Sequence, residues 1–398
     1  MGIWRTSDRM PWKETCPMDQ RVEFIAEWLR DEWTMTELAA RYQISRKTAY
    51  KWVARYASEP STGLAERSRA PHAHGRACPE TLRGSVLALR RRHPSWGPRK
   101  LLAILQEREP AQPWPAASTM GEWLRHAGLS APRRRTRYVV PLTSPLAAAA
   151  APNDVWTADF KGWFRTGDGT RCDPLTIADA CSRFVVCCRI TAPTQQAVRP
   201  WFVRAFRDHG LPRALRTDNG SPFASTGPAR LTALAVWWLK LGIQVDRIDP
   251  GHPEQNGRHE RFHLTLQQEA TATPAPTPRA QQRRFDRLRT EFNQVRPHEA
   301  LGQRPPARVF VPSPRPYPST LEDPWYDATH QVRRVNANGQ IKWQGEVVFI
   351  SEAMRRELVG LVETERGDWL VRFMAVELGR IDRRSRRFTP SWHGRRVG

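Results

Sequence analysis

The sequence of 398 residues contains 63 Lys and Arg against 40 Asp and Glu, which gives a formal net charge of +23. Such an excess predicts a polyanionic partner, because cationic side chains attract phosphates and release their counterions. No run approaches the roughly 20 apolar residues of a membrane span, and the six cysteines form no CxxC pair. We therefore expect no membrane partner and reduced thiols, in a chain long enough for several domains.

Residues 18–60 have the spacing of a helix-turn-helix domain, although an ordinary basic helical hairpin would look similar. Thr36 is expected to cap the first helix of the pair and Ser45 to cap the second, RKTAYKWVARY. The exposed face of that second helix is predicted to contact DNA through Arg46, Lys47, Tyr50 and Lys51.

A second helix-turn-helix-like domain is predicted for residues 81–130, after a linker rich in Pro, Ser, Gly and Arg. Its helices are short and interrupted by Pro, so the pattern is weaker than in the first domain. Ser118 is expected to begin the last helix and Gly128 to end it.

The pattern changes to mixed α/β between residues 150 and 272. Three strands are followed by alternating helices and strands, which is the order of an RNase H-like fold. A helical connector is expected at 279–312, and short strands at 328–390 indicate a small C-terminal β-barrel. The fold class is therefore multidomain, with all-α modules, an α/β core and a β domain.

Two aspartates in the α/β region are placed to share a site. Asp159 lies in the first strand (VWTADF), where an acid is costly to bury without a partner or a metal ion. Asp218 ends the fourth strand (LRTDNG), although Asp-Asn-Gly is also a common turn sequence. Converging carboxylates are the ligands that Mg²⁺ prefers, and two such ions about 4 Å apart can support phosphodiester chemistry.

The spacing alone leaves the third acid open between Glu254 and Glu260. The interval after Asp218 is 35 residues for Glu254 and 41 for Glu260. Glu254 is expected in a loop beside Pro253, whereas Glu260 would lie one turn into a helix, where a rigid backbone can aim it. We therefore prefer Glu260.

The segments WTADF, LRTDNGSPF and HPEQNGRHERFH resemble the retroviral-integrase-type catalytic core, and are most similar to bacterial insertion-sequence transposases. The resemblance implies a triad of two aspartates and a glutamate, carried over to Asp159, Asp218 and Glu260. Many relatives have 35 residues between the last two acids, which would favour Glu254, but the order of Pro253, Gly257 and Glu260 matches the family motif. The flanking Arg258 and Arg261 would grip the DNA backbone, or form a solvated helix face.

The resemblance further implies a DNA transposase that binds the terminal inverted repeats of a mobile element, frees 3′-OH ends and joins them to target DNA. Its cofactor would be two Mg²⁺ ions, with Mn²⁺ as a substitute, held by the triad. Its partners would be double-stranded DNA and at least one further copy of the chain, in a bacterial cytoplasm at the nucleoid. The alternatives are a transposase-derived DNA-binding regulator with an inactive core and an RNase H-like nuclease.

Overall fold

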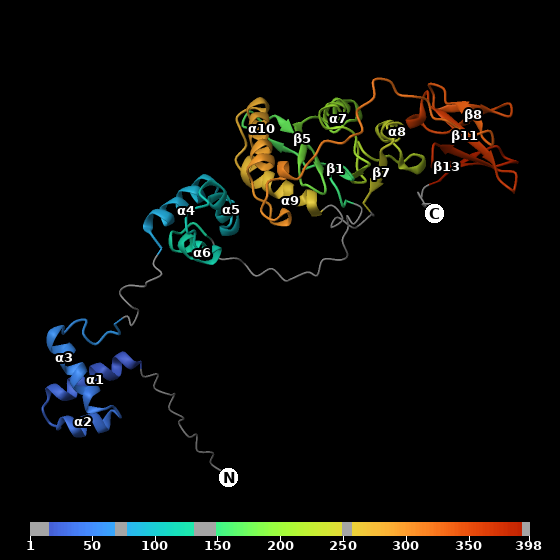
Figure 1. The fold of residues 1–398 in the computed structure, drawn as a ribbon. Coiled ribbons are helices and arrows are strands. Elements are labelled where there is room, and N and C mark those ends of the chain that lie inside the picture. Colours follow the sequence, from blue (N-terminus) through green and yellow to red (C-terminus); the bar gives the residue numbers. More distant parts are fainter. Residues whose placement is uncertain (1–15, 68–77, 131–148, 249–256, 392–398) are drawn as a thin grey trace, which may run out of the picture. The chain divides into compact units, whose positions relative to one another are not determined.

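The computed structural model describes residues 16–67, 78–130, 149–248 and 257–391. The chain divides into two compact units, Met1–Ala77 and Cys78–Gly398. Figure 1 shows the helices and strands of each unit. No helix within the described ranges is both long enough and apolar enough to cross a membrane.

The first unit contains three helices whose apolar faces meet in a small core. The helices are α1 (Pro17–Leu29), α2 (Met35–Arg41) and α3 (Arg46–Ser58). Phe24 of α1, Leu38 of α2 and Trp52 of α3 are buried together, as expected when each helix presents one apolar stripe.

The N-terminal caps of α2 and α3 can be compared with the two predicted ones. Ser45 caps α3, since its hydroxyl accepts from the Thr48 N–H at 3.2 Å. The prediction for α2 was wrong: its cap is Thr34, which forms a reciprocal capping box with Glu37, while Thr36 lies inside the helix. In this box the Thr34 side chain accepts from the Glu37 N–H and the Glu37 side chain accepts from the Thr34 N–H. Two N–H groups at the helix start are satisfied in this way.

The second unit begins with three more helices: α4 (Glu80–Arg92), α5 (Pro98–Arg108) and α6 (Ala117–His126). They enclose their own core around Trp96, Leu101 and Met120. Ser118 does not cap α6, because the cap position is Ala116 and no side chain bonds to the helix start. Gly128 follows the helix with φ +68°, the left-handed conformation in which glycine commonly ends helices.

A five-stranded sheet lies at the centre of the second unit, in the order β5-β4-β1-β6-β7. β1 pairs antiparallel with β4 and parallel with β6, which in turn pairs parallel with β7. Its strands are β1 (Val155–Phe160), β4 (Pro174–Asp179), β5 (Val185–Ile190), β6 (Ala214–Thr217) and β7 (Gln244–Arg247). A hairpin of β2 (Phe164–Arg165) and β3 (Arg171–Cys172) connects β1 to β4. Three antiparallel strands followed by two parallel ones are the predicted RNase H-like order.

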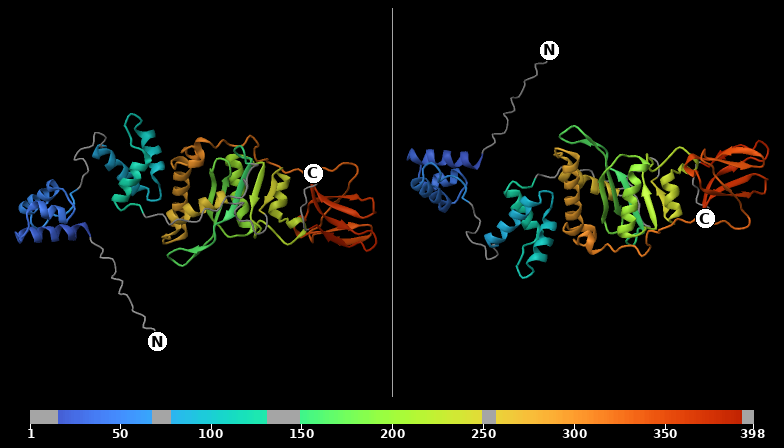
Figure 2. Two further views of the ribbon diagram at one scale, coloured as in Figure 1. Left: turned by 90° about the horizontal axis from the view of Figure 1, so that it is seen from below. Right: turned by 90° about the horizontal axis from the view of Figure 1, so that it is seen from above.

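Helices cover both faces of this sheet. Trp156 and Ala158 of β1 share one core with α7 (Gln195–His209) and α8 (Ala233–Lys240). The other core joins β5 to α9 (Gly257–Leu266), a π-helical turn (Gln267–Thr271) and α10 (Pro278–Gln294). Figure 2 shows α10 alongside the β5 edge. Since strand residues alternate between faces, Thr157 and Asp159 are directed away from the Trp156 side.

The C-terminal strands form an open sheet, so the prediction of a β-barrel was wrong. The sheet has the order β14-β13-β12-β11-β8, and β8 does not pair with β14 to close it. Its strands are β8 (Gln331–Arg334), β11 (Leu358–Glu363), β12 (Trp369–Phe373), β13 (Val376–Ile381) and β14 (Phe388–Pro390). β9 (Gln340–Trp343) and β10 (Glu346–Phe349) pair separately as a hairpin. Strand alternation predicts pairing but does not show whether the two edges meet.

Candidate active site

Asp159 and Asp218 are brought together by the parallel pairing of β1 and β6. In this register Ala158 lies opposite Thr217. The next residue along the chain after each is an aspartate, so Asp159 and Asp218 lie side by side at the carboxyl ends of the two strands. The backbone at Gly220 approaches Asp218 closely: a Cβ there would lie 2.9 Å from Oδ2 of the carboxylate. Glycine at this position leaves room for the carboxylate in its observed place.

Glu260 lies in the first turn of α9 and completes the group of acids. Burial, followed by the negative charge of Asp218 and more weakly that of Glu260, raises the pKa of Asp159 to about 7. Burial also raises the pKa of Asp218 above its ordinary range. The structure thus places the carboxylates of Asp218 and Glu260 within electrostatic reach of Asp159.

This group of acids fits a divalent cation. The Oδ1 atom of Asp218 is buried and has no hydrogen-bond partner, so it retains a free lone pair. Because burial raises the pKa of Asp159 to about 7, a cation bound beside it would favour its ionised form at neutral pH. Oxygen donors of this kind suit Mg²⁺ or Mn²⁺.

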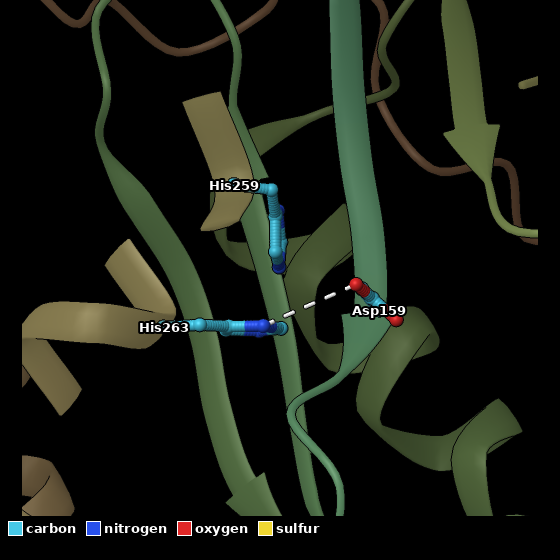
Figure 3. A group of neighbouring side chains, drawn as sticks. All are labelled: Asp159, His259 and His263. Atoms are coloured by element: carbon cyan, nitrogen blue, oxygen red, sulfur yellow. Dashed lines mark ion pairs between the residues drawn. The ribbon is translucent and has the colours of Figure 1, made fainter. Parts of the chain in front are cut away.

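Two histidines of α9 lie on the inner side of the same site (Figure 3). The ring of His259 is almost fully buried, and its two nitrogens lie 2.6 Å from the hydroxyls of Thr157 in β1 and Thr176 in β4. His263, one turn further along α9, places Nε2 2.8 Å from the Thr176 hydroxyl and Nδ1 4.0 Å from Oδ2 of Asp159. These contacts hold the helix that carries Glu260 against the strand that carries Asp159.

Both histidines are neutral at physiological pH. Burial, with repulsion from His263, holds the pKa of His259 well below its ordinary value. Burial and the charge of Lys161 lower the pKa of His263 to about 4. These two histidines were not among the predicted site residues. Their spacing of four residues on a predicted helix nevertheless indicates that they share one helix face.

The predicted DNA-contacting residues of α3 all lie on its exposed side: Arg46, Lys47, Tyr50 and Lys51. Arg261 of α9 is also exposed. The structure describes the backbone of Arg258 but not its side chain, and Glu254, the alternative third acid, lies outside the described residues.

Asp179 has a structural role in the turn that follows β4. Its carboxylate accepts hydrogen bonds from the backbone N–H groups of Asn153 at 2.8 Å and Ser182 at 2.7 Å, and from the Ser182 hydroxyl at 2.5 Å. The contacts with Ser182 satisfy hydrogen-bonding groups of the turn between β4 and β5. The contact with Asn153 joins this turn to the segment before β1.

Comparison with known protein families defines the class of the molecule. Models described as "Integrase core domain" match residues 149–253 and 241–306, over the sheet and the site. A "Helix-turn-helix domain" model matches residues 20–72, and a "Homeodomain-like domain" model matches residues 48–124. The chain thus has helix-turn-helix domains followed by an integrase-like core, which supports a polynucleotidyl-transferase type of enzyme.

Two curated proteins of insertion elements are similar in sequence. The chain is 33% identical over 178 residues to an uncharacterized 39.2 kDa protein of insertion element IS476 from Xanthomonas euvesicatoria, covering 44% of this chain and 49% of that protein. It is 32% identical over 190 residues to an uncharacterized 31.7 kDa protein of insertion element IS407 from Burkholderia multivorans, covering 46% of this chain and 65% of that protein. The chain thus spans less than two thirds of either relative. Over these regions it is similar to proteins of insertion elements that match integrase core and helix-turn-helix models.

Solved viral structures show a more distant similarity. The HTLV-2 integrase catalytic core domain in complex with magnesium is 15% identical and covers 40% of this chain and 97% of its own, with a TM-score of 0.32. A simian T-cell lymphotropic virus intasome in complex with the PP2A regulatory subunit B56 gamma is 16% identical. It covers 72% of this chain and 92% of its own, with a TM-score of 0.37.

Proposed function

We propose that the protein is a DNA transposase that cuts the ends of a mobile element and joins them to target DNA. The observation that supports this most directly is the group of three carboxylates at the ends of β1 and β6 and in the first turn of α9. Asp159 and Glu260 lie within regular elements and Asp218 directly follows β6, which gives the precision that phosphoryl transfer requires.

Asp159, Asp218 and Glu260 would hold the divalent cations, Mg²⁺ with Mn²⁺ as a substitute. Bound there, two such ions neutralise the scissile phosphate and lower the pKa of the attacking oxygen. The exposed Arg261 beside Glu260 would contact the DNA backbone, and Arg258 takes the same role by its place in the motif. His259 and its two threonine partners would keep Glu260 at a constant distance from Asp159.

The helix-turn-helix domains would recognise the terminal repeats of the element. The exposed face of α3 offers guanidinium- and ammonium-bearing side chains and a tyrosine near its N-terminus, a composition suited to phosphate and base contacts. Since the two ends of an element must be held together during joining, the active form would contain at least two copies of the chain.

The experiment is a nicking and strand-transfer assay on duplex DNA carrying the inverted repeats that flank this gene. It compares the wild type with Glu260→Gln and the matched variant Glu254→Gln, in Mg²⁺ and in Mn²⁺. Joined products from the wild type and Glu254→Gln, and none from Glu260→Gln, are the expected result. Loss only with Glu254→Gln would assign the third acid to Glu254 instead.

The same assay separates the two alternatives. Cleavage without joining would favour a nuclease of RNase H-like type. Repeat-specific binding with neither cleavage nor joining, in both metals, would favour a DNA-binding regulator with an inactive core.

A further inference from the structure

The hydrogen bonds around Thr176 indicate which nitrogen of His263 carries the proton. The Thr176 hydroxyl has one hydrogen, and the carbonyl oxygen of Asp159 can only accept it, at 3.1 Å. With that hydrogen donated to Asp159, the hydroxyl oxygen accepts from Nε2 of His263 at 2.8 Å. His263 is then the neutral tautomer with the proton on Nε2 and a lone pair on Nδ1.

The two Nδ1 atoms have different surroundings. That of His259 lies 2.6 Å from the Thr157 hydroxyl and its Nε2 lies 2.6 Å from the Thr176 hydroxyl, so both nitrogens of this ring are used within the protein. That of His263 faces Oδ2 of Asp159 at 4.0 Å, too far for a hydrogen bond (Figure 3). The nitrogen thus faces a carboxylate oxygen from beyond hydrogen-bond distance.

A divalent cation bound between two such electron-rich atoms would attract both of them. Ligand atoms bound to one divalent ion at about 2.1 Å each lie between about 3 and 4.2 Å apart, depending on the angle at the ion, so a separation of 4.0 Å is within reach of a single ion. The ligand atoms of Asp159, His259 and His263 all lie within 4.8 Å of one another. Since the nitrogens of His259 are engaged with threonines, His263 is the member of this group with a nitrogen available to a metal.

We propose that His263, through Nδ1, is a ligand of the divalent cation bound at Asp159. The inference rests on the proposed function only in placing a cation at Asp159, and it adds a nitrogen donor to a site otherwise made of oxygens. Such a mixed donor set favours Mn²⁺ over Mg²⁺ more strongly than carboxylates alone, because imidazole nitrogen suits transition metals better than it suits the hard Mg²⁺. Thr176 is then the positioning residue that fixes the tautomer and orientation of the His263 ring.

The test is pulsed electron paramagnetic resonance of Mn²⁺ bound to the full-length chain without DNA. A directly coordinated imidazole gives a ¹⁴N modulation, which carboxylates and water do not. We expect this modulation in the wild type and in the matched control His126→Ala, which removes an exposed histidine of α6. We expect it to be lost in His263→Ala, with Mn²⁺ affinity reduced roughly tenfold by calorimetry and Mg²⁺ affinity changed much less.

Two further variants keep the result interpretable. Asp159→Asn should abolish the Mn²⁺ site and its ¹⁴N signal, and an unchanged signal would place the nitrogen elsewhere and overturn the inference. His263→Asn retains a side chain able to donate to Thr176, so loss of ¹⁴N modulation with an unchanged circular dichroism spectrum supports ligation rather than unfolding. Modulation that persists in His263→Ala, or is absent from Mn²⁺-loaded wild type, overturns the inference.

The strand-transfer assay is run in parallel, so the two proposals can fail independently. Joining by a wild type whose Mn²⁺ shows no nitrogen ligand would reject His263 as a ligand and leave the transposase function standing. A nitrogen-ligated ion in a protein that neither nicks nor joins DNA would support the ligand and reject the function.

Discussion

The side-chain amide of Asn293 in α10 exchanges two hydrogen bonds with the backbone of Val185 in β5. Its Oδ1 accepts from the Val185 N–H at 2.9 Å, and its Nδ2 donates to the Val185 carbonyl at 2.9 Å. Gln282 of the same helix pairs similarly with the Ile190 N–H at 2.9 Å and the Cys188 carbonyl at 3.0 Å. Because β5 is an edge strand of the sheet, these amides take the place of a neighbouring strand and block pairing with other chains.

Replacing Asn293 with Ala should therefore destabilise the core. The substitution leaves the N–H and the carbonyl of Val185 unpaired at a buried position, which costs roughly 2–4 kcal/mol for the two groups. The free energy of unfolding in urea measures this. Gln294→Ala, at the exposed neighbouring position of α10, should change it by less than about 0.5 kcal/mol. Equal effects of the two variants would show that the amide pairing contributes nothing specific.

The ion pair between Arg296 and Glu269 should contribute far more than that between Arg99 and Glu299. The Arg296 side chain is 8% exposed, whereas those of Arg99 and Glu299 are 72% and 69% exposed. Glu269→Ala leaves a buried guanidinium uncompensated, next to Lys100, whose pKa burial and the charge of Arg296 already lower to about 8. We expect a loss of about 3–5 kcal/mol in the free energy of unfolding for Glu269→Ala and at most about 1 kcal/mol for Glu299→Ala.

The stability of the metal-free protein should fall between pH 5 and pH 8 because of Asp159. Folding raises the pKa of this acid from 3.8 to about 7, so the folded state binds its proton more tightly than the unfolded state. The stabilisation is fully present below pH 3.8 and is lost as the pH rises through about 7. The Asn side chain of Asp159→Asn does not titrate, so the variant does not lose this stability. Between pH 5 and pH 8 its free energy of unfolding should rise by on the order of 2 kcal/mol relative to that of the wild type.

Urea unfolding in a chelator at several pH values measures this difference. Asp208→Asn, which alters an exposed acid of α7, serves as the control for a general effect of removing a negative charge. A difference between wild type and Asp159→Asn that does not change with pH would contradict a raised pKa at this site.

The exposed face of α3 should account for part of the salt dependence of DNA binding. Lys47→Ala removes one cation from that face, so the affinity for duplex DNA should fall and the slope of log affinity against log salt should decrease by about 1. Fluorescence anisotropy at several salt concentrations gives both quantities. Arg30→Ala, at the exposed end of α1, removes an equal charge elsewhere and should leave the slope unchanged.

Several features of this protein follow from local sequence patterns alone. The helix-turn-helix spacing, the Ser45 cap and the order of strands and helices in the α/β core depend on neighbouring residues and on apolar periodicity. Asp159 within an apolar strand and Asp218 at the end of another can be paired from the sequence, because an acid in a buried strand needs a partner or a metal ion. The choice of Glu260 over Glu254 remains a prediction that depends on the motif.

Other features depended on the tertiary structure, because they join residues far apart in the chain. Whether the C-terminal sheet closes depends on β8 meeting β14, which strand alternation does not reveal. The contacts of His259 with Thr157 and of His263 with Asp159 depend on how α9 is rotated against the sheet. Helical periodicity places the two histidines on one face. Only the packing of that face against β1 and β4 decides that both nitrogens of His259 contact threonine hydroxyls, while Nδ1 of His263 lies 4.0 Å from the Asp159 carboxylate.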